Sequence, residues 1–168
     1  VMHTNGGIRS PDWWAELSKF QNLTVVFSID GLEDTNHIYR RNVNWDKLIN
    51  NVTSFISSGG NAIWEFLVFD HNQHQIDTAK DISSKLGFNE FKLKRPYGFN
   101  TIVNNIDAIN VIDKKGIFDY AIFPADGIKN LPFESKNFKH IGHDFTKQQY
   151  MSRQKNVASA SIVDEKFD

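Results

Sequence analysis

The stretch from Leu23 to Gly31 constrains the fold more than any other part of the chain. It is a short apolar run, rich in the branched and aromatic side chains that strands prefer. Because side chains alternate between the two faces of a strand, Ser28 and Asp30 point to the same side. Two interpretations of this pair stay open. It binds a small polar ligand at the carboxyl end of a buried strand, or it caps the loop that follows.

Strand and helix signals alternate through the first part of the chain, which predicts the α/β class. Strands that alternate with helices are joined by right-handed crossovers into a parallel sheet. Glu65 interrupts one nearly continuous apolar strand, where it either pairs with a basic neighbour or faces a site. The predicted elements are a strand end at 1–4, helices at 10–22, 44–60 and 72–87, and strands at 23–31, 62–69 and 88–94.

Helical spacing assigns particular roles to two groups of side chains. In the first helix, Trp13, Leu17 and Phe20 form one apolar stripe at the i, i+4, i+7 spacing. At the start of the third helix, Asn72 and Gln75 match a capping box. We therefore expect this stripe to face the core, with Trp13 and its neighbour Trp14 packed in the core or half-exposed. We expect the second group to close the amino end of a helix.

The pattern of parallel strands and helices weakens after residue 96. Residues 106–112 and 117–123 predict a hairpin. The rest of the chain is polar, and its last part shows no period, so we expect it to be mobile. His140 and His143 lie three apart in this polar part and are expected to be ordinary surface. The predicted divisions are a βα-repeat part at 1–96, a hairpin extension at 97–124 and a polar tail at 125–168.

Composition excludes several classes of function. The formal net charge is -1 over 168 residues, so the overall charge gives no case for binding nucleic acid or a membrane surface. No apolar run approaches the roughly 18 residues of a membrane span. No signal peptide is recognisable, so a cytoplasmic location is expected. The chain has no cysteine, which excludes disulfides and thiolate-held metal clusters within it.

Two further sets of polar residues could carry chemistry. Asp70, His71 and His74 could be drawn as a metal site, although their spacing is no specific metal signature and a capping box explains the segment more simply. Asp30 with His37 or His71 could supply the nucleophile and base of a hydrolase or phosphatase. The chain lacks the G-x-S-x-G nucleophile elbow that many such enzymes use.

Six short motifs follow one another along residues 1–96. They are Thr4-Asn5-Gly6, Val25 to Gly31, His37-Ile38-Tyr39-Arg40, Gly59-Gly60, Glu65 to Phe69 and Phe91 to Lys94. Each is weak alone, but their order and spacing together resemble the radical S-adenosylmethionine (radical SAM) family. The resemblance is closest to the peptide- and protein-modifying members, which carry a Ser-[Ile/Leu]-Asp-Gly strand.

The resemblance implies a partial, TIM-like (β/α)6 barrel, with residues 1–96 as strands three to six and an α+β or irregular extension after them. In that family the first strand leads to a three-cysteine loop that holds a [4Fe–4S] cluster, and the second carries a Gly-Gly-Glu type motif for SAM. Neither is present here. The resemblance therefore implies a fragment of a longer enzyme, which contributes part of a SAM pocket and is not catalytically competent alone.

The resemblance also implies which residues meet SAM. Ser28 and Asp30 would hydrogen-bond its ribose or methionine portion, and Arg40 would pair with its carboxylate through a bidentate contact. Lys94 would lie near the adenine. The residues that would border the pocket are Thr4 and Asn5.

The substrate and the partners are less constrained. The region after residue 96 lacks the cysteines of the auxiliary-cluster domain found in many relatives, so the substrate, a small molecule or a peptide, is left open. The alternative is a stand-alone βα module without a cluster, which binds a nucleoside or amino-acid ligand at the strand ends. A half barrel would leave an unpaired edge at its first strand, and we expect self-association through this edge.

Overall fold

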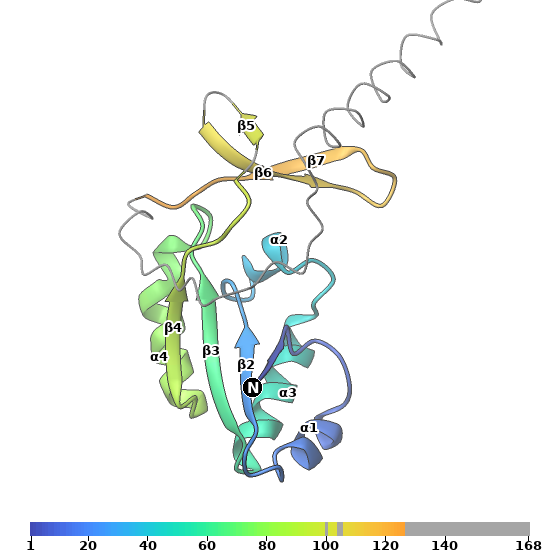
Figure 1. The fold of residues 1–168 in the computed structure, drawn as a ribbon, viewed down its shortest axis with the longest axis vertical. Helices are drawn as coiled ribbons and strands as arrows, with labels where there is room; N and C mark the ends of the chain where they lie inside the picture. Colours follow the sequence, from blue (N-terminus) through green and yellow to red (C-terminus); the bar gives the residue numbers. More distant parts are fainter. Residues whose placement is uncertain (100, 104–105, 127–168) are drawn as a thin grey trace, which may run out of the picture. The chain divides into compact units, whose positions relative to one another are not determined.

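The computed structural model describes residues 1–99, 101–103 and 106–126, and its central element is a four-stranded parallel sheet. The strands lie in the order β1-β2-β3-β4, so each strand neighbours the next one along the chain (Figure 1). This arrangement confirms the predicted α/β class and its parallel βα units. The strands are β1 (Met2–Thr4), β2 (Thr24–Ser28), β3 (Asn61–Leu67) and β4 (Glu90–Lys94).

Each connection between neighbouring strands contains a helix, and several helix ends follow the capping rules. The Ser10 side chain accepts a hydrogen bond from the Trp13 N–H at 3.3 Å, and the Asn44 side chain accepts one from the Lys47 N–H at 2.8 Å. Gly87 ends the last helix with φ +87°, a conformation that glycine adopts without strain. None of the helices in the described part of the chain is long and apolar enough to cross a membrane. They are α1 (Pro11–Leu17), α2 (Asn36–Tyr39), α3 (Trp45–Ser57) and α4 (Ile76–Leu86), with the short 3-10 helix η1 (Gln73–Gln75) directly before α4.

The two faces of the parallel sheet differ in chemistry. One face packs against the helices and forms the main core, in which Val25, Phe27 and Trp64 are fully buried. Residues in register on neighbouring parallel strands point to the same side of the sheet. The opposite side, which we call the polar face, therefore carries a row of hydrophilic side chains in register. The side chains in register are Ser28, Glu65 and Lys92, and Lys94 lies on the same side two residues further along β4.

The strand order explains why only one face is covered by the helices. Right-handed crossovers between consecutive parallel strands place the connecting helices on one side when the strand order follows the chain. Accordingly, Trp14 of α1, Phe55 of α3 and Ala79 of α4 belong to a single buried cluster with the apolar face of the sheet. The polar face is thus left outside this helix-packed core.

The first helix, α1, buries one of its two adjacent tryptophans and leaves the other partly exposed. Of the predicted stripe, Leu17 packs against the core, whereas Trp13 is 39% exposed and Phe20 is 66% exposed. The helix ends at Leu17, so Phe20 lies outside its period. Trp14 is buried instead, with its ring centroid 5.2 Å from that of Phe27 on β2.

A second, antiparallel sheet follows the parallel one along the chain and confirms the predicted hairpin. The Asp113 carboxylate closes the hairpin turn by accepting hydrogen bonds from the Lys115 N–H at 2.8 Å and the Ile117 N–H at 2.9 Å. The first of its strands, at Thr101–Val103, was not predicted, because a segment of three residues is too short to show a hydrophobic period. The strands, in spatial order, are β5 (Thr101–Val103), β6 (Ile106–Ile112) and β7 (Phe118–Ile122). The predicted tail with His140 and His143 lies outside the described residues.

The adjacent tryptophans of α1 provide a matched test of this core. We expect Trp14→Ala to lower the free energy of unfolding by about 3–5 kcal/mol, because it removes a buried aromatic ring and leaves a cavity. Trp13→Ala, which removes the same group from a partly exposed position, should cost about 1 kcal/mol or less. Urea denaturation of the three proteins measures the difference, and equal losses would contradict this assignment of the core.

Candidate functional site

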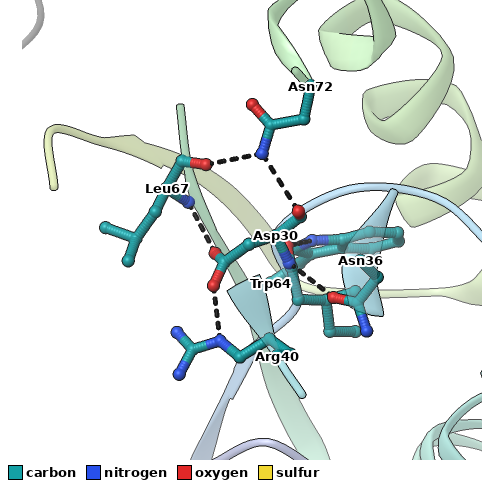
Figure 2. Close-up of polar contacts among 7 residues, drawn as sticks. Asp30, Asn36, Arg40, Trp64, Leu67 and Asn72 are labelled. Carbon is teal, nitrogen blue, oxygen red and sulfur yellow. Dashed lines mark hydrogen bonds and ion pairs between the residues drawn. The ribbon is translucent and has the colours of Figure 1, made fainter. Parts of the chain in front are cut away.

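Asp30 follows the carboxyl end of β2, and its fully buried carboxylate joins several segments of the chain (Figure 2). Its Oδ1 accepts a hydrogen bond from the Leu67 N–H at 2.7 Å, and its Oδ2 forms an ion pair with Arg40 Nε. Its own N–H donates to Asn36 Oδ1 at 2.9 Å, and its carbonyl accepts from Asn72 Nδ2 at 3.0 Å. The residue thus binds the end of β3 and the two loops that follow β2 and β3.

The register of β2 and β3 explains why a side chain is needed here. The Ile29 N–H still donates to the Glu65 carbonyl at 3.0 Å, so a continued parallel ladder would next pair the Leu67 N–H with the Ile29 carbonyl. That carbonyl instead accepts from Trp64 Nε1 at 2.8 Å. The Asp30 carboxylate takes the free Leu67 N–H, and it thereby ends the ladder while satisfying a backbone donor.

The chain turns sharply directly after Asp30, and this turn requires glycine. Gly31 has φ +136°, which side-chain-bearing residues rarely adopt. A Cβ atom at this position would also overlap the Thr35 side chain and approach the Asn36 backbone nitrogen to 2.9 Å. The Asp30-Gly31 pair therefore lets α2 approach closely enough for Asn36 to bind the Asp30 backbone.

Asn72 and Gln75 hold the loops of the site together and do not form the predicted capping box. Asn72 Nδ2 donates to the carbonyls of Asp30 and Leu67, and its Oδ1 accepts from the Phe69 N–H at 2.7 Å. Gln75 Oε1 accepts from the Leu32 N–H at 3.0 Å. Both side chains are buried, so they satisfy backbone groups of two loops rather than the first turn of a helix. Their amide character was visible in the sequence, but their partners were not.

The electrostatics of Asp30 are set mainly by its burial. Burial raises the pKa of Asp30 to about 6, and the Arg40 guanidinium opposes this rise by favouring the charged form. The neighbouring Glu65 carboxylate adds a smaller increase. The Asp30–Arg40 pair is therefore a charge-assisted contact that exists at neutral pH and weakens in mild acid.

Arg40 uses only part of its hydrogen-bonding capacity on Asp30. Its Nε bonds the carboxylate, and its guanidinium carbon lies 5.1 Å from the centre of the Tyr39 ring. Within the described part of the chain, no residue accepts a hydrogen bond from its two terminal nitrogens, and the side chain is 25% exposed. A guanidinium held at Nε in this way can bind a second anion through both terminal nitrogens.

The polar face brings two more of the predicted residues near this pair. Lys94 Nζ lies 2.7 Å from Glu65 Oε2, so the strand carboxylate is paired with a basic neighbour, which was one of the two expected roles. Ser28 lies directly opposite Glu65 in register. Ser28, Glu65 and Lys94 thus form a hydrophilic row across three strands, and Asp30 follows Ser28 by two residues.

Thr4 and Asn5 lie in a different setting from the other predicted residues. Thr4 is in register with Phe27, which places its side chain on the side of the sheet that faces the helices. Its Oγ1 accepts from the Gly6 N–H at 3.0 Å, and Asn5 Oδ1 accepts from the Gly7 N–H at 3.0 Å. Both side chains therefore stabilise the turn that follows β1, at the same carboxyl edge of the sheet.

The histidines of this region form neither a metal site nor a pair with Asp30. Among the described residues, no group of three or more His, Cys, Asp or Glu side chains is arranged to hold a metal ion. His71 stacks on Phe69 with ring centroids 5.2 Å apart, and burial lowers its pKa to about 4, so it is neutral at physiological pH. The hydrolase hypothesis requires a histidine beside Asp30. The described hydrogen bonds of the Asp30 carboxylate go instead to Arg40 and to the Leu67 N–H, and none goes to a histidine.

The structure defines an α/β protein with a parallel sheet and, at the carboxyl ends of its strands, a buried aspartate paired with a partly exposed arginine. Comparison of the chain with protein-family models, with curated proteins and with solved structures finds no significant match.

The pKa of Asp30 predicts a specific pH dependence of stability. It is about 6 in the folded chain against an ordinary value of 3.8, so the folded state binds more protons than the unfolded state between these values. The contribution of Asp30 to the unfolding free energy should therefore be greatest below about pH 4, fall as the pH rises to about 6, and then level off. Denaturation series from pH 4 to 7 should show this fall in the wild type but not in Asp30→Asn. The control Asp107→Asn, at an exposed carboxylate, should retain it, and an unchanged profile in Asp30→Asn would refute the assignment.

A second prediction concerns the amide that joins the two loops. Asn72→Ala should lower the free energy of unfolding by about 3 kcal/mol, because it leaves the buried N–H of Phe69 and two carbonyls without partners. Asn61→Ala removes one exposed side-chain hydrogen bond to Thr24 and should cost less than about 1 kcal/mol. Thermal and urea unfolding measure both values. Similar losses would show that Asn72 does not join the loops as described.

Proposed function

We propose that this chain contributes part of the SAM-binding pocket of a radical SAM enzyme. The observation that carries the proposal is the Arg40 guanidinium, which is held at Nε by a buried aspartate and whose two terminal nitrogens have no hydrogen-bond acceptor among the described residues. It lies at the carboxyl ends of parallel strands, where α/β proteins bind small ligands. SAM carries a carboxylate on its methionine portion, and this group suits a bidentate guanidinium contact.

The fold supports the proposal through the order of its strands. Consecutive parallel strands with helices on one side are the arrangement of a (β/α) barrel, in which the other side of the sheet faces inward. We propose that residues 1–96 are strands three to six of a partial (β/α)6 barrel. The polar face, with Ser28, Glu65 and Lys94, would then line its interior.

We assign the residues of the site to different parts of the SAM molecule. The two terminal nitrogens of Arg40 suit its carboxylate, and Ser28 suits a hydroxyl of the ribose or the amino group of the methionine portion. Lys94, paired with Glu65, would lie near the adenine. The residues proposed to border the pocket are Thr4 and Asn5, through the turn that they stabilise.

The [4Fe–4S] cluster of the family does not fit the residues of this chain. Iron–sulfur clusters are held chiefly by cysteine thiolates, and these 168 residues contain none. We therefore assign no step of SAM cleavage to this chain, and its cluster ligands would have to be supplied from outside these residues. The reacting substrate, a small molecule or a peptide, would be set by those parts as well.

A stand-alone small-molecule binding module is the second candidate. It is favoured by the closed hydrogen-bond network of Asp30, which needs no group from outside the described residues. Such a module would bind a nucleoside or amino-acid ligand at the same strand ends without radical chemistry. Both candidates use Arg40 to bind an anion, so they share the binding test below.

The proposal predicts carboxylate-dependent binding of SAM to the 168-residue chain. Isothermal titration calorimetry should show binding to the wild type, and Arg40→Gln should weaken it about 10- to 100-fold by removing charge-assisted hydrogen bonds. Decarboxylated SAM should bind the wild type more weakly by a similar factor. The matched control Arg9→Gln, at an arginine that lies over the Trp13 ring, should retain wild-type affinity. Absence of SAM binding, or equal affinity in Arg40→Gln, would refute the assignment.

A further inference from the structure

The antiparallel sheet holds the loop that carries Arg40. Arg41 Nη1 donates to the Ile112 carbonyl at 2.6 Å, and Arg41 Nη2 pairs with Asp119 Oδ2 at 3.1 Å. The Tyr120 hydroxyl donates to the Ile38 carbonyl at 2.6 Å. We call this set of contacts, made by Arg41 and Tyr120, the loop clamp.

The clamp contacts the loop both before and after Arg40 in the sequence. Ile38 precedes Arg40 by two residues, and Arg41 follows it directly. The helix α2 that leads into Arg40 is only four residues long, which is too short to be stable without tertiary contacts. Apart from the clamp, two local hydrogen bonds hold the backbone of Arg40. Its N–H donates to the Asn36 carbonyl at 2.8 Å, and its carbonyl accepts from the Val43 N–H at 3.3 Å.

The residues directly after β7 hold the second loop of the site. Phe69 and Pro124 form an isolated antiparallel bridge, and the Asp70 N–H donates to the Phe123 carbonyl at 3.1 Å. The Asp126 N–H donates to Gln73 Oε1 at 2.9 Å. Both loops that bind Asp30 are therefore tied to the segment that begins with β7.

The ion pair of the clamp contributes little to folding stability. The Arg41 and Asp119 side chains are 38% and 42% exposed, and exposed ion pairs contribute little to folding stability. Their effect on the orientation of a neighbouring group can be larger, because an anion that binds a mobile guanidinium must first order it. The position of the clamp beside Arg40 thus indicates a role in ligand binding rather than in the stability of the core.

We propose that Arg41 and Tyr120 are positioning residues that hold the Arg40 guanidinium ready for a ligand carboxylate. This proposal deepens the proposed function and rests on it. The antiparallel sheet then contributes to affinity for the carboxylate portion of SAM without touching the ligand. Loss of the clamp lowers affinity through Arg40 alone, so it should leave a ligand without that carboxylate unaffected.

A double-mutant cycle tests this dependence in the 168-residue chain. We expect Tyr120→Phe and Arg41→Gln each to weaken SAM binding severalfold, and together about tenfold, in calorimetry. Neither should change binding of decarboxylated SAM, and neither should weaken SAM binding further when Arg40→Gln is already present. Lys19→Gln, which removes the cation of an exposed ion pair with Glu16, is the control and should retain wild-type affinity.

A ligand-free measurement separates failure of the clamp from failure of the proposed function. Hydrogen exchange at the Arg40 amide should become about tenfold faster in the clamp variants, because local opening of α2 becomes easier. If SAM does not bind the wild type but this exchange accelerates, the proposed function fails and the clamp on Arg40 stands. If SAM binds and Arg40→Gln weakens it, while the clamp variants change neither affinity nor exchange, the positioning role is overturned. Equal weakening of both ligands would also overturn it. Arg41→Lys, which keeps the charge but loses the fork, provides a milder variant should Arg41→Gln unfold.

Discussion

The buried carboxylate of Asp30 is the constraint on which the arrangement of this site depends. A carboxylate removed from water is costly unless hydrogen bonds and an opposite charge compensate for its lost hydration. Asp30 obtains these from the Leu67 N–H and Arg40, while Asn36 and Asn72 bind its backbone. Because these partners come from the end of β3 and from two separate loops, satisfying one side chain brings all three segments together.

The two faces of the parallel sheet carry different kinds of residues. Its apolar face packs on the helices through residues such as Phe27 and Phe66, and the polar face carries the hydrophilic row that begins at Ser28. Trp64 links the two, because its ring lies in the core while its Nε1 donates to the Ile29 carbonyl beside Asp30. The end of the β2–β3 ladder is thus stabilised from the core side of the sheet.

The loops at the carboxyl ends of the strands owe their order to contacts far away in the sequence. The helix α2 is a single short turn, yet it presents Arg40 to Asp30 because Asn36 binds the Asp30 backbone. On the other side, Arg41 and Tyr120 tie the same loop to β6 and β7. A rigid sheet and several long-range hydrogen bonds therefore support a site that short-range propensity alone could not maintain.

The sequence by itself determined the α/β class, the alternation of strands and helices, the hairpin and the presence of Asp30 at a strand end. These features are local, since side-chain period and turn chemistry act over a few residues. Only the tertiary structure decided that Trp14 rather than Trp13 is buried, that Asn72 joins two loops and that Arg40 pairs with Asp30. Partners of this kind depend on strand register and on the approach of distant segments, and no spacing rule within one segment records them.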